Sequence, residues 1–180
     1  YFLLTISSVG LILLSYMIIY IPKFNYIKAR IFSFFDKETG THNFQSDKAI
    51  ESITSGGFFG KGIGEGTLKN RVPEAHTDYI ISVISEEFGV IAIILILILF
   101  LVLIYMVFKK ISFETEEQNK LILIGSVSLI LMQATIHIGV NIRLFPTTGM
   151  TLPFLSYGGS SIVSTSILTG IILNLTKRKI

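Results

Sequence analysis

The polar run at residues 73–78 holds the side chains of this sequence best suited to chemistry. It reads Pro-Glu-Ala-His-Thr-Asp and ends just before a long apolar stretch. Asp78 would therefore lie at a membrane face, where partial removal from water would make its carboxylate a stronger base. A structural role also fits, because Thr77 could cap a helix that begins here and Asp78 in its first turn would oppose the helix dipole.

Two further acids, Glu86 and Glu87, stand directly before 21 uncharged residues at 88–108. Acids at that depth are costly unless they face water, a cation or a basic partner. On a helix that begins at Asp78, Glu86 lies about 80° round from Asp78, and Glu87 points to the opposite side. The basic residues available to pair with these acids, or to contact phosphate, are Lys61, Lys69, Arg71 and Arg143.

Six glycines fall between residues 56 and 66. The run lacks the preceding strand and the Gly-Lys-Ser/Thr ending of a phosphate-binding loop, which argues against nucleotide binding. It could be a flexible exit from a membrane segment, or a loop that drapes over a substrate head group. The histidines at 42, 76 and 137 lack zinc-site spacing. Gln133, His137 and Asn141 form a polar stripe in an apolar stretch, which favours hydrogen bonds between helices over substrate contact.

A run of small residues at 156–161, Ser-Tyr-Gly-Gly-Ser-Ser, lies at the outer end of the last apolar stretch. Its expected depth is similar to that of Asp78, so it could line the same cavity. Small residues continue along this stretch at four-residue spacing, which predicts close packing against another helix. They are Ser156, Ser160 and Ser164, and then Ser166 and Gly170.

Four uncharged stretches, at residues 1–21, 88–108, 121–142 and 152–176, must position these groups. Each has at least 21 residues, enough to span a hydrocarbon core of about 30 Å. In the whole chain 51% of residues are hydrophobic and 15% are charged, and the mean hydropathy is +0.69. Basic residues cluster beside the apolar stretches, so the net charge of +3 does not indicate nucleic-acid binding. The absence of cysteine excludes disulfides, thiol catalysis and thiolate metal sites.

Basic residues follow the first, second and fourth stretches, and the positive-inside rule places them in the cytoplasm. They are Lys23, Lys28 and Arg30, then Lys109 and Lys110, then Lys177, Arg178 and Lys179. All three stretches then run inward, so an outward crossing must be hidden in the polar region between the first two.

The sequence thus predicts an all-α, polytopic transmembrane helix bundle in a single domain, with about five crossings. The crossings are expected near 1–21, 44–60, 79–108, 120–142 and 152–176, with outside loops near 61–78 and 143–151. The first stretch has neither an initiator methionine nor a basic region before it. We therefore expect a C-terminal fragment of a larger membrane protein.

At these motifs the chain resembles the SEDS family of shape, elongation, division and sporulation proteins. One family signature is similar to residues 56–62, 73–80 and 86–89, and a second to residues 146–161. The details are more like the cell-division branch than the elongation branch. The resemblance implies a ten-helix, multi-pass protein of the bacterial inner membrane, of which this chain supplies the last five helices. Departures from the family pattern, which leave Asp78 unaffected, occur at Asn70, His137, Arg143 and Thr148.

The resemblance also implies an enzyme, a peptidoglycan glycosyltransferase that polymerises lipid II into glycan strands at the outer membrane face. Asp78 falls on the family's essential aspartate and would be the base for the acceptor hydroxyl, in one inverting displacement without a protein nucleophile. A divalent cation, Mg²⁺ or Mn²⁺, is implied for the departing pyrophosphate, although a basic side chain could serve. No metal ligand is assigned. The predicted substrate-binding residues are Lys61, Lys69, Arg71, Glu74, His76, Thr77, Glu86, Ser156, Tyr157, Gly158, Gly159 and Ser160.

The expected partners are lipid II, the membrane, a class B penicillin-binding protein and other division proteins, but not nucleic acid. Two other functions stay open, a lipid II flippase and a non-catalytic division scaffold. A flippase needs polar residues along the full depth of the bundle. Here the ionisable groups gather on the outer side and residues 88–108 are uninterrupted, which favours an enzyme.

Overall fold

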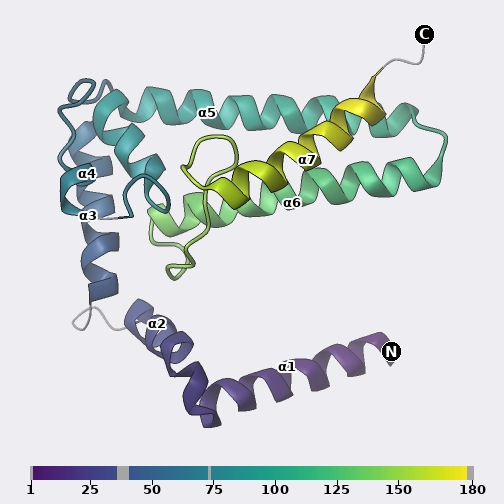
Figure 1. Ribbon diagram of the computed structural model, residues 1–180, viewed down its shortest axis with the longest axis horizontal. Coiled ribbons are helices and arrows are strands. Elements are labelled where there is room, and N and C mark those ends of the chain that lie inside the picture. Colours follow the sequence, from purple (N-terminus) through teal and green to yellow (C-terminus); the bar gives the residue numbers. More distant parts are fainter. Residues whose placement is uncertain (1, 36–40, 73, 178–180) are drawn as a thin grey trace. The chain divides into compact units, whose positions relative to one another are not determined.

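The computed structural model describes residues 2–35, 41–72 and 74–177, and every regular element in these ranges is a helix (Figure 1). The predicted all-α class is confirmed. The chain divides into two compact units, Tyr1–Phe44 and Gln45–Ile180. The helices are α1 (Phe2–Tyr20), α2 (Asn25–Phe35), α3 (Thr41–Gly56), α4 (Leu68–Arg71), α5 (Ile80–Phe113), α6 (Glu117–Asn141) and α7 (Gly159–Thr176), with a 3-10 turn at Pro22–Phe24.

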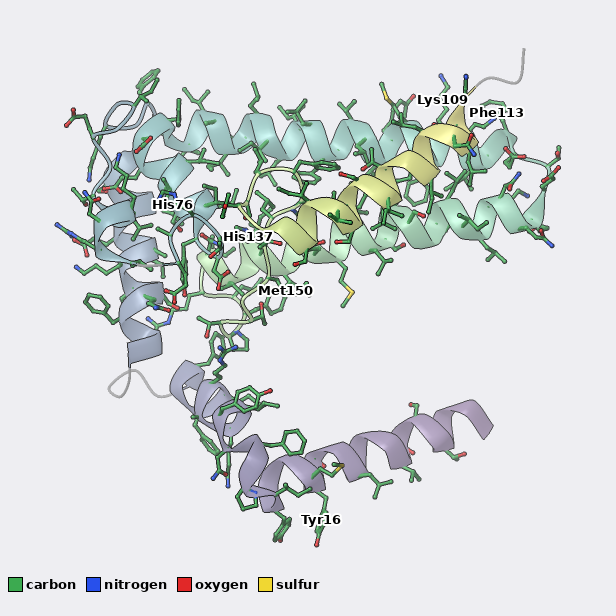
Figure 2. All side chains as sticks on the ribbon, viewed as in Figure 1. Tyr16, His76, Lys109, Phe113, His137 and Met150 are labelled. Atoms are coloured by element: carbon green, nitrogen blue, oxygen red, sulfur yellow. The ribbon has the colours of Figure 1, made fainter. Side chains whose placement is uncertain are left out.

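In the first unit, α1 ends at Tyr20, and Pro22 opens the 3-10 turn that leads into α2. Proline suits the first position of a helical turn because its φ is already fixed near −65° and its missing N–H is not needed there. Tyr16 and Tyr20 lie one turn apart on α1, with ring centroids separated by 4.5 Å. Figure 2 labels Tyr16 on this helix.

In the second unit, α5, α6 and α7 form a bundle, and among the described residues these three helices are long and apolar enough to cross a membrane. Figure 1 shows α5 and α6 running side by side, and α7 packs against both. Val107, Val127 and Ile172 are buried where the three helices meet. The outward face of α5 stays apolar, with side chains such as Leu99 and Leu101 about 61% exposed. Such a surface is stable against lipid tails rather than against water.

The helix α3 runs across one end of this bundle (Figure 1), and residues near both of its ends contact that end. Near its start, Gln45 Nε2 donates to Glu74 Oε2 at 3.0 Å. At its last residue, a β-carbon added to Gly56 would lie 2.0 Å from the carbonyl oxygen of Ser85. The 16 residues of α3 measure about 24 Å, less than the roughly 30 Å of a hydrocarbon core. The crossing near residues 44–60 stays a prediction, which cysteine labelling can test.

The helix α5 is interrupted at Gly89, whose φ of 79° and ψ of −178° are not helical. The glycine-rich loop at 56–62 packs its main chain against this break, where Val90 N donates to Gly57 O at 3.0 Å. A β-carbon on Gly89 would lie 2.2 Å from Phe58 O, so only glycine allows the two main chains to approach this closely. Residues 88–108 are thus uninterrupted by charge, but their helix is interrupted at Gly89. The glycine run is used for close packing here, rather than as a flexible exit.

Candidate active site

The turn that carries Asp78 precedes α5 and is not part of it. The helix begins at Ile80, with Tyr79 in the N-cap position and no capping hydrogen bond from a side chain. Thr77 Oγ1 donates instead to Glu74 O at 3.1 Å, and Asp78 N donates to the same carbonyl at 3.0 Å. The structural alternative, a cap by Thr77 with Asp78 in the first helical turn, is therefore wrong. A separate turn ends at Tyr79, so the helix begins at Ile80, two residues later than expected.

Three successive carbonyls in this turn, at residues 76, 77 and 78, accept hydrogen bonds from the C-terminal part of the chain. Tyr157 N donates to the first at 3.1 Å, and Ser156 Oγ donates to the second at 2.7 Å. Asn141 Nδ2 donates to the third at 3.0 Å. The two motif regions, more than 60 residues apart in the sequence, are thus in direct contact at one end of the bundle.

The Asp78 carboxylate lies beside the loop that joins α6 to α7. Asp78 is partly exposed, and a β-carbon added to Gly149 would stand 3.5 Å from Asp78 Oδ2. The φ of Gly149 is 70°, in the left-handed region that favours glycine. Figure 2 shows the neighbouring Met150 at the same end of the bundle as His76 and His137. Sequence reasoning missed Gly149 as a site residue, and its only signal was a glycine inside the second signature.

The carboxylate of Glu86 is buried and saturated with donors. Glu86 is 1% exposed, and it accepts from Lys61 Nζ at 2.8 Å and from Leu68 N at 3.0 Å. Thr67 donates to it from both N and Oγ1, at 3.0 and 3.1 Å. A buried carboxylate requires such partners. In this structure the contacts of Glu86 and Lys61 hold the loop before α4. The angular relation expected between Glu86 and Asp78 does not apply, because Asp78 lies outside the helix.

The other predicted phosphate ligands, Lys69 and Arg71, also face carboxylates. Lys69 Nζ lies 3.1 Å from Glu87 Oε1. Arg71 Nη1 lies 3.7 Å from Glu51 Oε1, and both of these side chains are about half exposed, at 49% and 55%. Exposed ion pairs contribute only about 0–1 kcal/mol. Arg71 can therefore change partner at little cost.

The predicted substrate-binding residues at 156–160 differ in exposure. Ser156 is only 5% exposed, whereas Tyr157 is 79% exposed. Gly158 is partly exposed, and Gly159 and Ser160 are exposed. In the turn before α5, the predicted residues Glu74 and His76 are exposed as well. Ser156 thus points into the protein, while its neighbours border solvent.

The close packing expected for the small residues of α7 stays a prediction, and within the described part of the chain Gly170 does not take part in such packing. A β-carbon added to Gly159 or to Gly170 would meet nothing within 4 Å. The reason is that α7 buries another face, on which Thr165 and Ile172 lie seven residues apart. Gln133, on the neighbouring helix α6, donates to the Thr151 carbonyl at 2.9 Å.

Across the described ranges, no three His, Asp or Glu side chains gather closely enough to hold a metal ion. Protein-bound divalent cations are held by oxygen ligands, often from several carboxylates. Mg²⁺ can also be held by one or two carboxylates together with substrate phosphates, so a divalent cation stays a prediction, and no step below is assigned to one.

Comparison with known proteins agrees with the signatures. A family model described as "Cell cycle protein" (FTSW_RODA_SPOVE) matches residues 1–180. The chain is 36% identical over 181 residues to the probable peptidoglycan glycosyltransferase FtsW of Enterococcus hirae, covering 95% of this chain and 46% of that protein. It is 38% identical over 158 residues to the protein of the same name from Caulobacter vibrioides, covering 87% of this chain and 40% of that one.

A solved structure described as "Structural coordination of polymerization and crosslinking by a peptidoglycan synthase complex" has a similar fold, with a TM-score of 0.73 at 23% identity. The match covers 97% of this chain and 48% of the solved chain. The chain thus spans about half the length of the curated relatives it matches. It belongs to the SEDS family, the FtsW, RodA and SpoVE group of cell cycle proteins.

Proposed function

We propose that this chain is part of a peptidoglycan glycosyltransferase that polymerises lipid II at the outer face of the bacterial cytoplasmic membrane during cell division. The observation that carries the proposal is the setting of Asp78. Its carboxylate lies beside Gly149, and its turn is bonded to the last residue of α6 and to the segment that follows α6. The curated relatives named as probable peptidoglycan glycosyltransferases support the same activity.

Asp78 would act as the general base of a single displacement. The acceptor hydroxyl attacks the anomeric carbon of the donor sugar, and its proton passes to the Asp78 carboxylate. The bond between that carbon and the pyrophosphate oxygen breaks, and the electron pair leaves with undecaprenyl pyrophosphate. One such step inverts an α-linked donor into a β-linked product, so no protein nucleophile is needed. A positioned base contributes about 10²–10⁴ in rate.

The departing pyrophosphate needs positive charge, and of Lys61, Lys69 and Arg71 the side chain least constrained by its ion pair is Arg71. Lys61 is bound to the buried Glu86, and Lys69 is bound to Glu87. Within the described part of the chain, the ion pair of Arg71 is a long contact to an exposed carboxylate, so Arg71 can turn to phosphate without leaving a buried charge unpaired.

The apolar helices beside the site suit the lipid part of the substrate. The undecaprenyl tail of lipid II is itself apolar, which suits a site at the end of the apolar helices α5, α6 and α7. We propose a class B penicillin-binding protein as partner, because the solved structure with a similar fold is described as a complex for polymerization and crosslinking. The division role follows the naming of the curated relatives.

The direct test is to purify the whole gene product and supply it with lipid II. We expect glycan strands, resolved by gel electrophoresis, together with released undecaprenyl pyrophosphate. If the protein moved lipid II between the leaflets of a vesicle without forming strands, transport would replace polymerisation as its function. If it did neither and only retained a partner, it would be a scaffold.

A further inference from the structure

We infer that Asn141 and Ser156 are positioning residues, which fix the main chain of the Asp78 turn so that its carboxylate stays beside Gly149. This inference rests on the proposed function of Asp78. It also gives Ser156 a role different from the predicted substrate contact, because Ser156 is buried.

The side chain of Asn141 is completely buried, at 0% exposure, and both ends of its amide are engaged. Its Oδ1 accepts from Ser82 Oγ at 2.7 Å and from Ser82 N at 3.2 Å. Its Nδ2 donates to Asp78 O at 3.0 Å and to His137 O at 2.9 Å. The N–H of Ser82 can only donate, so it must face the amide oxygen. The amide NH₂ is thereby directed to the two carbonyls.

The hydroxyl of Ser156 is oriented by the same logic. Its Oγ accepts from Leu152 N at 2.8 Å and lies 2.7 Å from Thr77 O. Because Leu152 N–H can only donate, the single hydroxyl proton is left for the Thr77 carbonyl. Two adjacent peptide groups, those after Thr77 and Asp78, are thus each tied to a buried side chain from a different part of the chain.

The consequence for Asp78 follows from its place in the chain. It precedes the first helical residue, Ile80, so the regular hydrogen bonds of α5 do not fix its carbonyl. The peptide groups before and after Asp78 are both held. The main chain therefore cannot shift the carboxylate, which can move only by rotation about its own side-chain bonds. A displacement of about 1 Å at a reacting group can lower the rate about 10²-fold.

The chain offers a matched control in Gln133. This side chain joins α6 to the segment before α7 through a bond of 2.9 Å to Thr151 O, and to α7 itself through a bond of 3.2 Å to Ser161 Oγ. None of these bonds reaches the turn at residues 76–78. Removing Gln133 therefore loses a comparable interhelical connection without releasing Asp78.

The experiment measures kcat and KM for lipid II with the whole gene product carrying Asn141→Ala, Ser156→Ala, Ser156→Thr or Gln133→Ala. We expect kcat to fall about 10–100-fold in both alanine variants of the positioning residues, while KM changes less than about threefold. Ser156→Thr keeps the hydroxyl and should recover most of the rate, and Gln133→Ala should stay within about threefold of wild type.

Equal losses in Gln133→Ala, or losses confined to KM, would overturn the inference and assign these bonds to general packing. If Asn141→Ala lowers the folded yield, the comparison of kcat between Ser156→Ala and Ser156→Thr is enough to test the inference. Wild-type kcat in both alanine variants, combined with an inactive Asp78→Asn protein, would refute the positioning role and leave the proposed function standing. An active Asp78→Asn protein would instead refute the proposed function itself.

Discussion

The carboxylate of Asp78 faces the empty side-chain position of Gly149, because a β-carbon added to Gly149 would stand 3.5 Å from Asp78 Oδ2. The two residues come from the two separate signatures of the family. Because residue 149 is glycine, no side chain from this position fills the space beside the carboxylate. We expect the acceptor to approach the base from this side.

Gly149→Ala should therefore lower glycan polymerisation more than it lowers stability. The new methyl group would lie against Asp78, and the φ of 70° at Gly149 would cost an alanine about 1–2 kcal/mol. Rates of strand formation and thermal unfolding midpoints of the purified protein measure the two effects.

Gly57→Ala is the matched control for this change. The φ of Gly57 is also positive, at 57°, but a β-carbon there would meet nothing within 4 Å. The control should show a similar loss of stability with little loss of rate. Equal losses of rate in both variants would mean that backbone strain, and not the space beside Asp78, accounts for the effect.

Glu86→Ala should destabilise the protein more than Glu87→Ala does. Removing Glu86 leaves the partly buried N–H of Thr67 and the buried N–H of Leu68 without their acceptor, and a buried unsatisfied group costs about 1–3 kcal/mol. Glu87 is bound by Lys69, a partly exposed pair worth about 1 kcal/mol or less. Thermal unfolding in detergent compares the two variants. If Glu86→Ala kept wild-type stability but had a raised KM for lipid II, the result would support the prediction that Glu86 contacts the substrate.

Membrane topology can be tested with single cysteines, because the chain has none of its own. Labelling with an impermeant thiol reagent should place positions 69 and 143 outside, and positions 110 and 178 inside. Position 28 is decisive. The charge pattern, with its hidden crossing, predicts that position 28 is inside.

The contacts of α3 give the opposite expectation for position 28. Gln45 is bonded to Glu74 and Asp47 pairs with Arg143, so the start of the described second unit lies with the loops that are predicted to be outside. Residues 29–44 contain no apolar stretch of membrane length. On these contacts we expect position 28 to be labelled from outside. Labelling from inside would establish the fifth crossing.

Hydropathy was enough to find the bundle, because α5 and α6 each come from one long uncharged run flanked by charges. It could not locate where α7 begins. The last crossing was expected to start at 152, but the helix starts at Gly159. The intervening segment folds back, so that Ser156 binds both Leu152 N and the turn before α5. Apolar composition is the same whether such a segment is helix or loop.

Sequence reasoning could predict only part of the site. Asp78 stood out as an acid before an apolar run, and the signatures named the regions that meet around it. The burial of Glu86 and the break at Gly89 depend on close approach of a distant loop. Contacts between residues far apart in the chain leave no periodic signal, so neither could be predicted.

The central claim is that Asp78 is the base for glycan polymerisation, and the rate of strand formation by Asp78→Asn tests it most directly. Asparagine keeps the size of the side chain but cannot take up the proton, so we expect a loss of about 10²–10⁴-fold or more, with folded yield and lipid II binding retained. Asp47→Asn, which removes an exposed carboxylate from α3, should polymerise normally. An Asp78→Asn protein that forms glycan strands at the wild-type rate would contradict the account.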